Sequence, residues 1–159
     1  MKIAVITVGK LKESYLKEAV SEYLKRLSRY ADVNVMEVDD ERTDENAGEN
    51  EIRNVLRKEG ERILGRIREN DRVIALAIEG ETFDSVGLSA KLKSYQDRSV
   101  SRLVFVIGGS LGLSEEVYRR SDERWSFSKL TFPHQLMRVI LLEQIYRGFR
   151  ILKNEPYHK

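Results

Sequence analysis

The chain has 159 residues, of which 28 are Lys or Arg, 26 are Asp or Glu, two are His and none is Cys. This length predicts one domain, residues 1–159, with a core that is stable without covalent cross-links. The absence of Cys excludes disulfides, a thiolate nucleophile and Cys-ligated metal centres, and the two isolated His residues argue against a dedicated metal site. No apolar run approaches the ~20 residues that cross a bilayer, and no signal peptide is recognisable, so we expect a soluble, cytoplasmic protein without membrane contact.

The net charge of +2 is distributed unevenly along the chain. Residues 1–36 carry seven basic and four acidic side chains, residues 37–71 carry seven and twelve, and residues 129–159 carry six and two. If the two basic ends meet in the folded protein, they form one positive face of the kind that binds a phosphate-rich partner. The alternative is a set of ordinary solvated faces.

The hydrophobic pattern predicts strands alternating with helices along the whole chain. Strands are expected at residues 2–8, 33–38, 72–78, 103–107 and 125–127. Helices, identified by apolar residues three or four positions apart, are expected at 12–30, 52–67, 85–97 and 134–153, with a short one after Ser114. The polar segment 39–50 is expected to be a surface loop, and residues 79–81 a turn. Five strands joined by helices predict a three-layer α/β domain with a mostly parallel sheet.

A glycine-rich turn follows the most apolar of these strands. Leu103–Ile107 is continuous in apolar residues, as in a buried parallel strand, and three glycines lie within the next five positions, at 108, 109 and 112. Glycine lets the backbone turn sharply and approach a ligand closely. The spacing is not the dinucleotide fingerprint, and no Walker lysine follows. The turn therefore indicates a cofactor-sized ligand, with a purely structural turn as the alternative.

The C-terminal third combines an unusual loop with an apolar helix. In the segment Phe127–Gln135, phenylalanines bracket small hydroxyl residues, a composition suited to an apolar slot with free backbone groups. The helix expected after Pro133 is apolar on nearly all sides and must be buried on several of them. A symmetric subunit interface that includes Val139, Leu142 or their neighbours is one explanation. A helix deep in the core of a monomer is the other.

Several segments form a combination that is specific, although none of them is specific alone. They are Val8–Lys12, Ile107–Gly112, Phe127–Gln135, Arg138–Arg147 and Pro156–Lys159. In these segments, and in its length, the chain resembles the ribosomal large-subunit methyltransferase H family.

This resemblance implies a fold, an activity and a set of cofactor residues. The expected fold is the SPOUT class of α/β domain with a C-terminal trefoil knot, and the expected assembly is a homodimer. The family transfers a methyl group from S-adenosylmethionine to N3 of a pseudouridine in 23S rRNA of the ribosome, without a metal. The cofactor positions that the resemblance implies here are Leu76, Gly108, Phe127, Ser128, Lys129, Leu130, Thr131 and Phe132.

Three further residues are candidates for contact with the substrate RNA. Methylation at N3 requires loss of the N3 proton, so a base or a group that stabilises the anion would help. Tyr157 and His158 are suited to this by their chemistry, and Arg147 could grip phosphate or stabilise a developing anion. The alternative is that this terminal pair only binds RNA, or is disordered as many chain ends are. No general base is identified.

Two other classes of protein are compatible with parts of the sequence. A nucleotide-dependent oxidoreductase is disfavoured, because the glycine spacing is wrong and no acidic residue ends a second strand after such a turn. A non-enzymatic module that binds RNA or the ribosome would explain the basic ends equally well. It gives no reason for the glycine turn and the Phe-bracketed loop to occur together.

Overall fold

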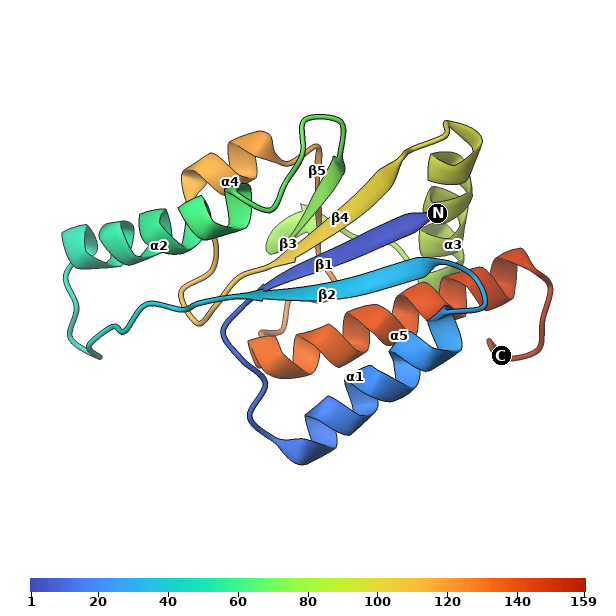
Figure 1. Cartoon of the computed structure of the whole chain (residues 1–159), viewed down its shortest axis with the longest axis horizontal. Coiled ribbons are helices and arrows are strands. Elements are labelled where there is room, and N and C mark those ends of the chain that lie inside the picture. The colour runs from blue at the N-terminus through green and yellow to red at the C-terminus, as the bar shows by residue number, and fades with distance from the viewer.

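A five-stranded, all-parallel sheet forms the centre of the computed structural model, which describes all 159 residues (Figure 1). Its strands stand in the order β2-β1-β4-β3-β5. Their bounds are Lys2–Val8 (β1), Asp32–Val38 (β2), Arg72–Glu81 (β3), Arg102–Ile107 (β4) and Glu123–Trp125 (β5). The predicted α/β class and the parallel sheet are confirmed.

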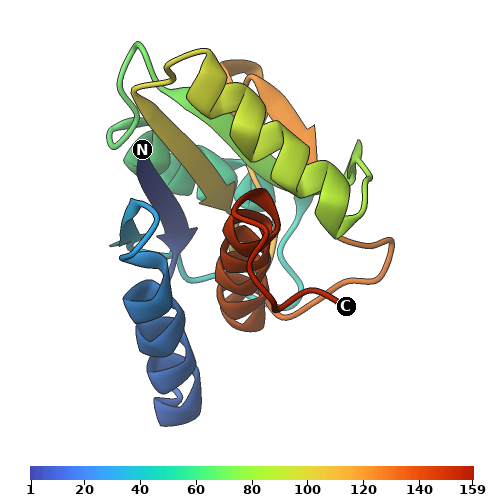
Figure 2. The same ribbon diagram turned by 90° about the vertical axis from the view of Figure 1, so that its right-hand side faces the viewer.

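Helices cover both faces of the sheet and make the domain three-layered (Figures 1 and 2). One face packs against α1 (Ser14–Leu27), α3 (Ser85–Asp97) and α5 (His134–Leu152), and the other against α2 (Glu49–Leu64) and α4 (Glu115–Arg120). Alternate residues of each strand point to opposite faces of the sheet. Ile3 and Val5 belong to the core under α1, α3 and α5, and Ala4 and Ile6 to the core under α2 and α4. Strands β1 and β4 are apolar throughout because both of their faces are covered.

Several element boundaries differ from those predicted. Helix α1 begins at Ser14 and not at residue 12, and α2 begins at Glu49, inside the segment expected to be a loop. The short last strand is Glu123–Trp125, two residues earlier than expected. The predicted turn at 79–81 is wrong, because β3 extends to Glu81 through an irregularity in its pairing with β5.

Helix α5 is buried by its own chain. It packs between α1 and α3, and from Met137 to Leu152 none of its residues is exposed. Leu142 is fully buried in the core and cannot contact a second subunit, whereas Val139 is half-buried, so an interface through this helix stays a prediction. The alternative, a helix within the core of the monomer, accounts for the apolar character of α5 along most of its length.

The structure contains no helix with the length and apolarity needed to cross a membrane.

A buried arginine fixes the first half of α5 to the sheet. The side chain of Arg138 is 1% exposed, and its guanidinium pairs with the Glu37 carboxylate at 2.6 Å. It also donates to the backbone carbonyl of Gly9 at 2.8 Å. These bonds join α5 to the carboxyl ends of β1 and β2, which positions the start of the helix beside the glycine turn.

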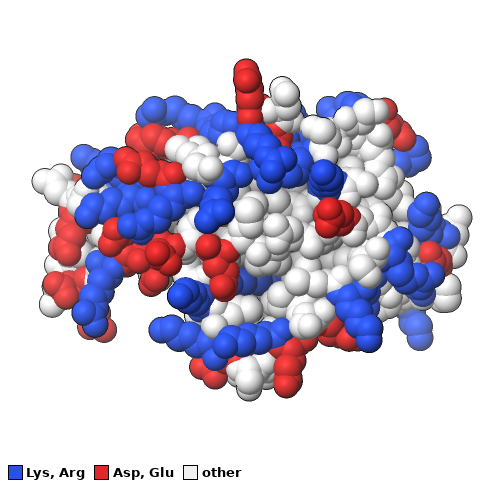
Figure 3. Space-filling model, in the orientation of Figure 1, with Lys and Arg blue, Asp and Glu red and all other residues white.

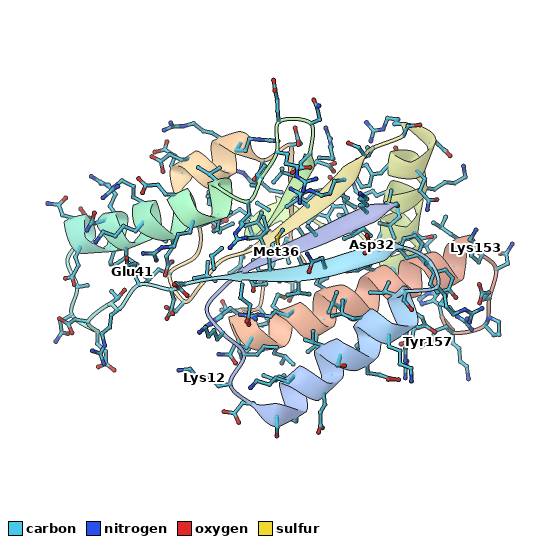
Figure 4. All side chains as sticks on the ribbon, in the orientation of Figure 1. Lys12, Asp32, Met36, Glu41, Lys153 and Tyr157 are labelled. Carbon is cyan, nitrogen blue, oxygen red and sulfur yellow. The ribbon has the colours of Figure 1, made fainter.

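The C-terminal tail folds back on the far end of α5. Tyr157 packs edge-on against Tyr146, with ring centroids 4.9 Å apart, and Arg150 pairs with Glu155. Figure 4 shows Lys153 and Tyr157 at one end of the molecule, and Glu41, just beyond the carboxyl end of β2, at the opposite end. The tail is therefore ordered, and it lies remote from the carboxyl ends of the strands. The trefoil knot implied by the resemblance stays a prediction.

The two basic ends of the chain do meet, since α1 packs against α5. They do not form one continuous positive surface on the face shown in Figure 3, where Lys and Arg side chains are interspersed with Asp and Glu.

Candidate functional site

A cleft of about 420 Å³ opens at the carboxyl ends of β3 and β4. Three segments form its walls: the end of β3, the glycine turn after β4 and the loop between β5 and α5. The first turn of α5 closes one side. Its lining residues are Leu76–Glu79, Ile107–Leu113, Tyr118, Trp125, Phe127, Ser128, Leu130–Phe132, His134 and Met137. Ligand sites in parallel α/β sheets lie at this edge, and the volume is in the range of small-molecule and cofactor pockets.

The glycine turn closes tightly on itself. The Gly112 amide donates to the Gly109 carbonyl at 3.1 Å, and Gly112 has a φ of +90°, a conformation that favours glycine. A Cβ on Gly108 would lie 2.5 Å from the carbonyl oxygen of Gly112, in steric overlap with main chain. Gly108 is therefore required by the turn itself, in addition to any ligand that approaches it.

An excursion of β3 forms the opposite wall. Both Leu76 and Glu81 pair with Trp125, so the residues between them leave the regular ladder and enter the lining of the cleft. Gly80 makes this possible, because a Cβ there would lie 2.6 Å from the carbonyl carbon of Trp125. The strand is secured again where the Ser126 amide donates to the Glu81 carbonyl at 2.8 Å.

A charged network holds the end of this excursion. Lys91 of α3 bridges the carboxylates of Glu81 and Glu123 at 3.1 and 3.4 Å. Glu123 also accepts hydrogen bonds from Tyr95 at 2.5 Å and from Arg72 at 2.9 Å. Burial alone would raise the pKa of Glu123, but these hydrogen bonds outweigh it and lower the pKa to about 2.

The loop before α5 is held by its own serines. The Ser128 hydroxyl accepts from the Leu130 amide at 2.9 Å, and the Ser126 hydroxyl donates to the Ser128 carbonyl at 3.1 Å. Leu130 is left 71% exposed, so it offers an apolar surface at the mouth of the cleft.

The cleft is mostly apolar and contains few charges. Glu79 is the only Asp or Glu in its lining, and no Lys or Arg lines it. His134, at the start of α5, is the other titratable group besides Tyr118. Burial, followed by the nearby charge of Arg138, lowers the pKa of His134, which favours a neutral imidazole at pH 7.

Seven of the eight cofactor positions named from the sequence line this one cleft: Leu76, Gly108, Phe127, Ser128, Leu130, Thr131 and Phe132. Lys129 belongs to the same loop but is exposed and outside the lining. The eight positions come from three segments separated by up to about fifty residues, and the fold brings them to the same edge of the sheet.

The three candidate RNA-contacting residues form a second cluster, on the tail end of α5. The Arg147 guanidinium contacts Glu143 at 2.5 Å and the Nδ1 atom of His158 at 3.2 Å, and lies over the ring of Tyr157. The Tyr157 hydroxyl donates to Glu143 at 3.0 Å. Burial and this hydrogen bond raise the pKa of Tyr157, so at neutral pH it is a proton donor in hydrogen bonds and not a base.

The two clusters lie at opposite ends of one helix. His134 begins α5 beside the cleft, and the tail folds on its last turns. A helix of 19 residues is about 28 Å long at 1.5 Å per residue. The tail of a chain therefore does not reach the cleft of the same chain in this structure.

Sequence reasoning missed several lining residues. Glu79 was placed in a turn, Tyr118 comes from the short helix α4, and His134 was not assigned a role. The position of His134 directly after the Phe-bracketed loop was the available signal. Nothing in the sequence pointed to Tyr118.

Comparisons with known proteins agree on one family. The family model described as "Predicted SPOUT methyltransferase" matches residues 1–158. The chain is 53% identical to Ribosomal RNA large subunit methyltransferase H of Enterococcus faecalis and 56% identical to the protein of that name from Bacillus cytotoxicus. Both alignments cover 100% of each chain. A solved structure, a probable methylase family protein from Haemophilus influenzae Rd KW20, has a TM-score of 0.56 at 12% identity, covering 99% of this chain and 70% of that one, and shows the fold alone.

Proposed function

The chain belongs to the SPOUT methyltransferase family, and we propose that it methylates N3 of a pseudouridine in 23S rRNA of the large ribosomal subunit, with S-adenosylmethionine as donor. The observation that carries the proposal is the convergence of seven family cofactor positions on one cleft of suitable size. Full-length relatives named for this activity support the same substrate class.

The residues of the cleft fit the parts of the proposed donor. Its apolar walls, with Leu76 on one side and Phe127 and Phe132 on another, suit a flat adenine, while the main chain of the loop can pair with the edge of the base. When bound, S-adenosylmethionine supplies an activated methyl group on a sulfonium. The work left to the protein is to hold the target nitrogen in line with the carbon–sulfur bond, and positioning of this kind can supply several kcal/mol.

We assign RNA contact to Arg147, Tyr157 and His158. A guanidinium only donates hydrogen bonds, so in its 3.2 Å contact with His158 the Nδ1 atom is placed to accept. This arrangement leaves Nε2 of His158, beside the Arg147 guanidinium, for contact with a nucleotide. Because the tail lies remote from the cleft of its own chain, the tail of a second copy is proposed to complete the site.

The homodimer in this proposal is supported by the surface around the cleft. Four large apolar side chains are exposed there, Ile78, Leu111 and Leu130 in the lining and Leu136 on the first turn of α5. An isologous contact whose twofold axis lies between the cleft and the tail would cover these residues with the partner's tail. Sedimentation at micromolar concentration should give about twice the monomer mass of 18.5 kDa. A stable monomer would contradict a composite site.

Equilibrium dialysis with labelled S-adenosylmethionine tests the proposed donor. We expect saturable binding of one molecule per chain. A module that only binds RNA would show none, and this outcome would refute the enzymatic proposal. NADH, measured in parallel by fluorescence, should not bind, because the turn lacks the dinucleotide spacing.

Removal of Tyr157–Lys159 tests the assignment of the tail. Methyl transfer should fall far more than cofactor affinity, because the tail is proposed to contact RNA and not the donor. A second variant, Tyr157→Phe, keeps the ring on Tyr146 and loses only the hydroxyl that donates to Glu143, so it separates the contribution of the hydroxyl from that of the whole tail. Methylation at the full rate by the truncated protein would show that the tail has no role.

A further inference from the structure

The charge of the cleft is unusual for a protein that acts on RNA. Its lining contains one carboxylate, Glu79, and no Lys or Arg. The side chain of Glu79 is exposed and forms no ion pair within the protein, whereas its neighbour Glu81 pairs with Lys91 at 3.1 Å. The lining of the cleft therefore carries one negative charge and no positive charge, which favours a cationic ligand over phosphate.

The backbone holds this carboxylate at the cleft. Glu79 lies in the excursion of β3 between Leu76 and Glu81, and both ends of the excursion are paired with Trp125. Gly80, the next residue, fits against the main chain of β5 with no room for a Cβ. The position of Glu79 is thus set by the sheet and not by a free loop.

Arg124 of β5, the strand paired with β3, lies against an aromatic ring of the cleft. The guanidinium of Arg124 lies 4.3 Å from the ring centroid of Tyr118, a residue of the cleft lining, and forms no salt bridge with Glu79. Both charges act on Tyr118. Burial and the charge of Glu79 raise the pKa of Tyr118, and the charge of Arg124 lowers it. Glu79 and Tyr118 line the same cleft, so the carboxylate of Glu79 can act on a charge bound there.

We propose that Glu79 makes the cleft select the methyl donor over the demethylated product by charge. This rests on the proposed function. At neutral pH the donor carries a sulfonium, an ammonium and a carboxylate, with net charge of one positive unit. Once the methyl group has moved to the nucleotide nitrogen and the N3 proton has been lost, the remaining thioether is neutral at sulfur and the product has no net charge. A carboxylate beside the cleft stabilises the donor more than the product, which favours exchange of one for the other after each turnover.

Isothermal calorimetry with S-adenosylmethionine and S-adenosylhomocysteine tests this selection. The variant is Glu79→Gln, which keeps the size and removes the charge. The matched control is Glu116→Gln, because Glu116 is an exposed acid of α4 outside the cleft lining. If the bound sulfonium lies about 6 Å from this carboxylate, Coulomb attraction at a dielectric between those of protein surface and water predicts that the ratio of donor to product affinity falls about three- to tenfold in Glu79→Gln. The control should keep the wild-type ratio.

The outcomes separate this inference from the proposed function. If wild-type protein binds neither compound, the proposed function fails. If wild-type binds both and Glu79→Gln changes both affinities by the same factor, or changes neither, the selection by charge is wrong while the cofactor site stands. The wild-type ratio should also fall as NaCl is raised from 20 to 500 mM, and the ratio of Glu79→Gln should not. A ratio that is independent of salt in wild-type protein would overturn the inference.

Discussion

Substitution of Gly108 by Ser is the perturbation that connects the fold of the glycine turn most directly to the cleft. The Cβ of the new residue would lie 2.5 Å from the carbonyl oxygen of Gly112 and 2.6 Å from its carbonyl carbon. These are main-chain atoms of the same turn, so the overlap cannot be relieved by a side-chain rotation. The turn must open, and the lining from Ile107 to Leu113 must shift with it.

The expected loss of stability in Gly108→Ser is moderate, because the steric overlap is confined to one turn. Overpacking in a well-packed region costs about 1–3 kcal/mol, and only one turn is affected here. We expect the free energy of unfolding to fall by about that amount in urea titrations, with the protein still folded, and the affinity for S-adenosylmethionine to fall at least about tenfold.

Gly48→Ser is the matched control for this prediction. A Cβ at Gly48 meets no atom within 4 Å, and Ser is preferred to Gly at the helix N-cap that this residue occupies. Stability and cofactor affinity should therefore be retained. Wild-type affinity and stability in Gly108→Ser would refute the reasoning about the turn.

Three further predictions concern stability and RNA contact. The pKa of Glu123 is about 2 in the folded protein and near its usual value of 4.5 in the unfolded chain, so its contribution is complete above pH 4.5 and is lost as the pH falls toward 2. The free energy of unfolding of wild-type protein, from urea titrations, should fall by up to about 3 kcal/mol between pH 5 and 2, and that of Glu123→Gln should fall less; equal slopes would contradict the network. Arg102→Met should destabilise the protein by about 3 kcal/mol, because it leaves a buried carboxylate without its cation. That carboxylate belongs to Asp71, is 3% exposed and is bound by Nε and Nη2 of Arg102. A change below about 1 kcal/mol would show that the pair is replaceable. Binding to large ribosomal subunits should weaken linearly in log–log plots against salt, with a lower slope after removal of Tyr157–Lys159, and an unchanged slope would exclude phosphate contact by the tail.

The strands were predictable from the sequence where helices cover both faces of the sheet. In β1 and β4 both faces are covered by helices, which forces an uninterrupted apolar sequence that is readable without the structure. The end of β3 was not predictable in this way. Glu79, Gly80 and Glu81 read as a turn by composition, but Glu81 returns to the sheet because Lys91 and the Ser126 amide bind it. These partners lie ten or more residues away, beyond any local signal.

For helix α5, the sequence predicts burial but does not identify the elements that bury it. An apolar surface must be removed from water, but the same surface can be covered by the rest of the chain or by a second subunit. Leu142 faces the core between α1 and α3, so the monomer itself provides the cover that a second subunit was expected to provide. The exposed apolar residues are found instead around the cleft, where Leu130 is 71% and Ile78 48% exposed.

The candidate site was predictable as far as its motifs extend. The glycine turn and the Phe-bracketed loop both lie at the carboxyl edge of the sheet, where parallel strands place ligands. Glu79 and Tyr118 reach the same cleft only through the β3 excursion and the packing of α4. Their sequence neighbourhood contains no motif, so their role became visible only from the folded chain.

Transfer of a methyl group to ribosomes is the measurement that tests the central claim most directly. Large subunits from a bacterial strain that lacks the modification are incubated with the purified protein and labelled S-adenosylmethionine, and the digested rRNA is analysed by mass spectrometry. The account predicts one methyl group per subunit, on N3 of a single pseudouridine of 23S rRNA, and far less methylation of the same subunits by the Tyr157–Lys159 truncation. Saturable binding of the donor without any methyl transfer, or a methyl group on another atom or nucleotide, would contradict it.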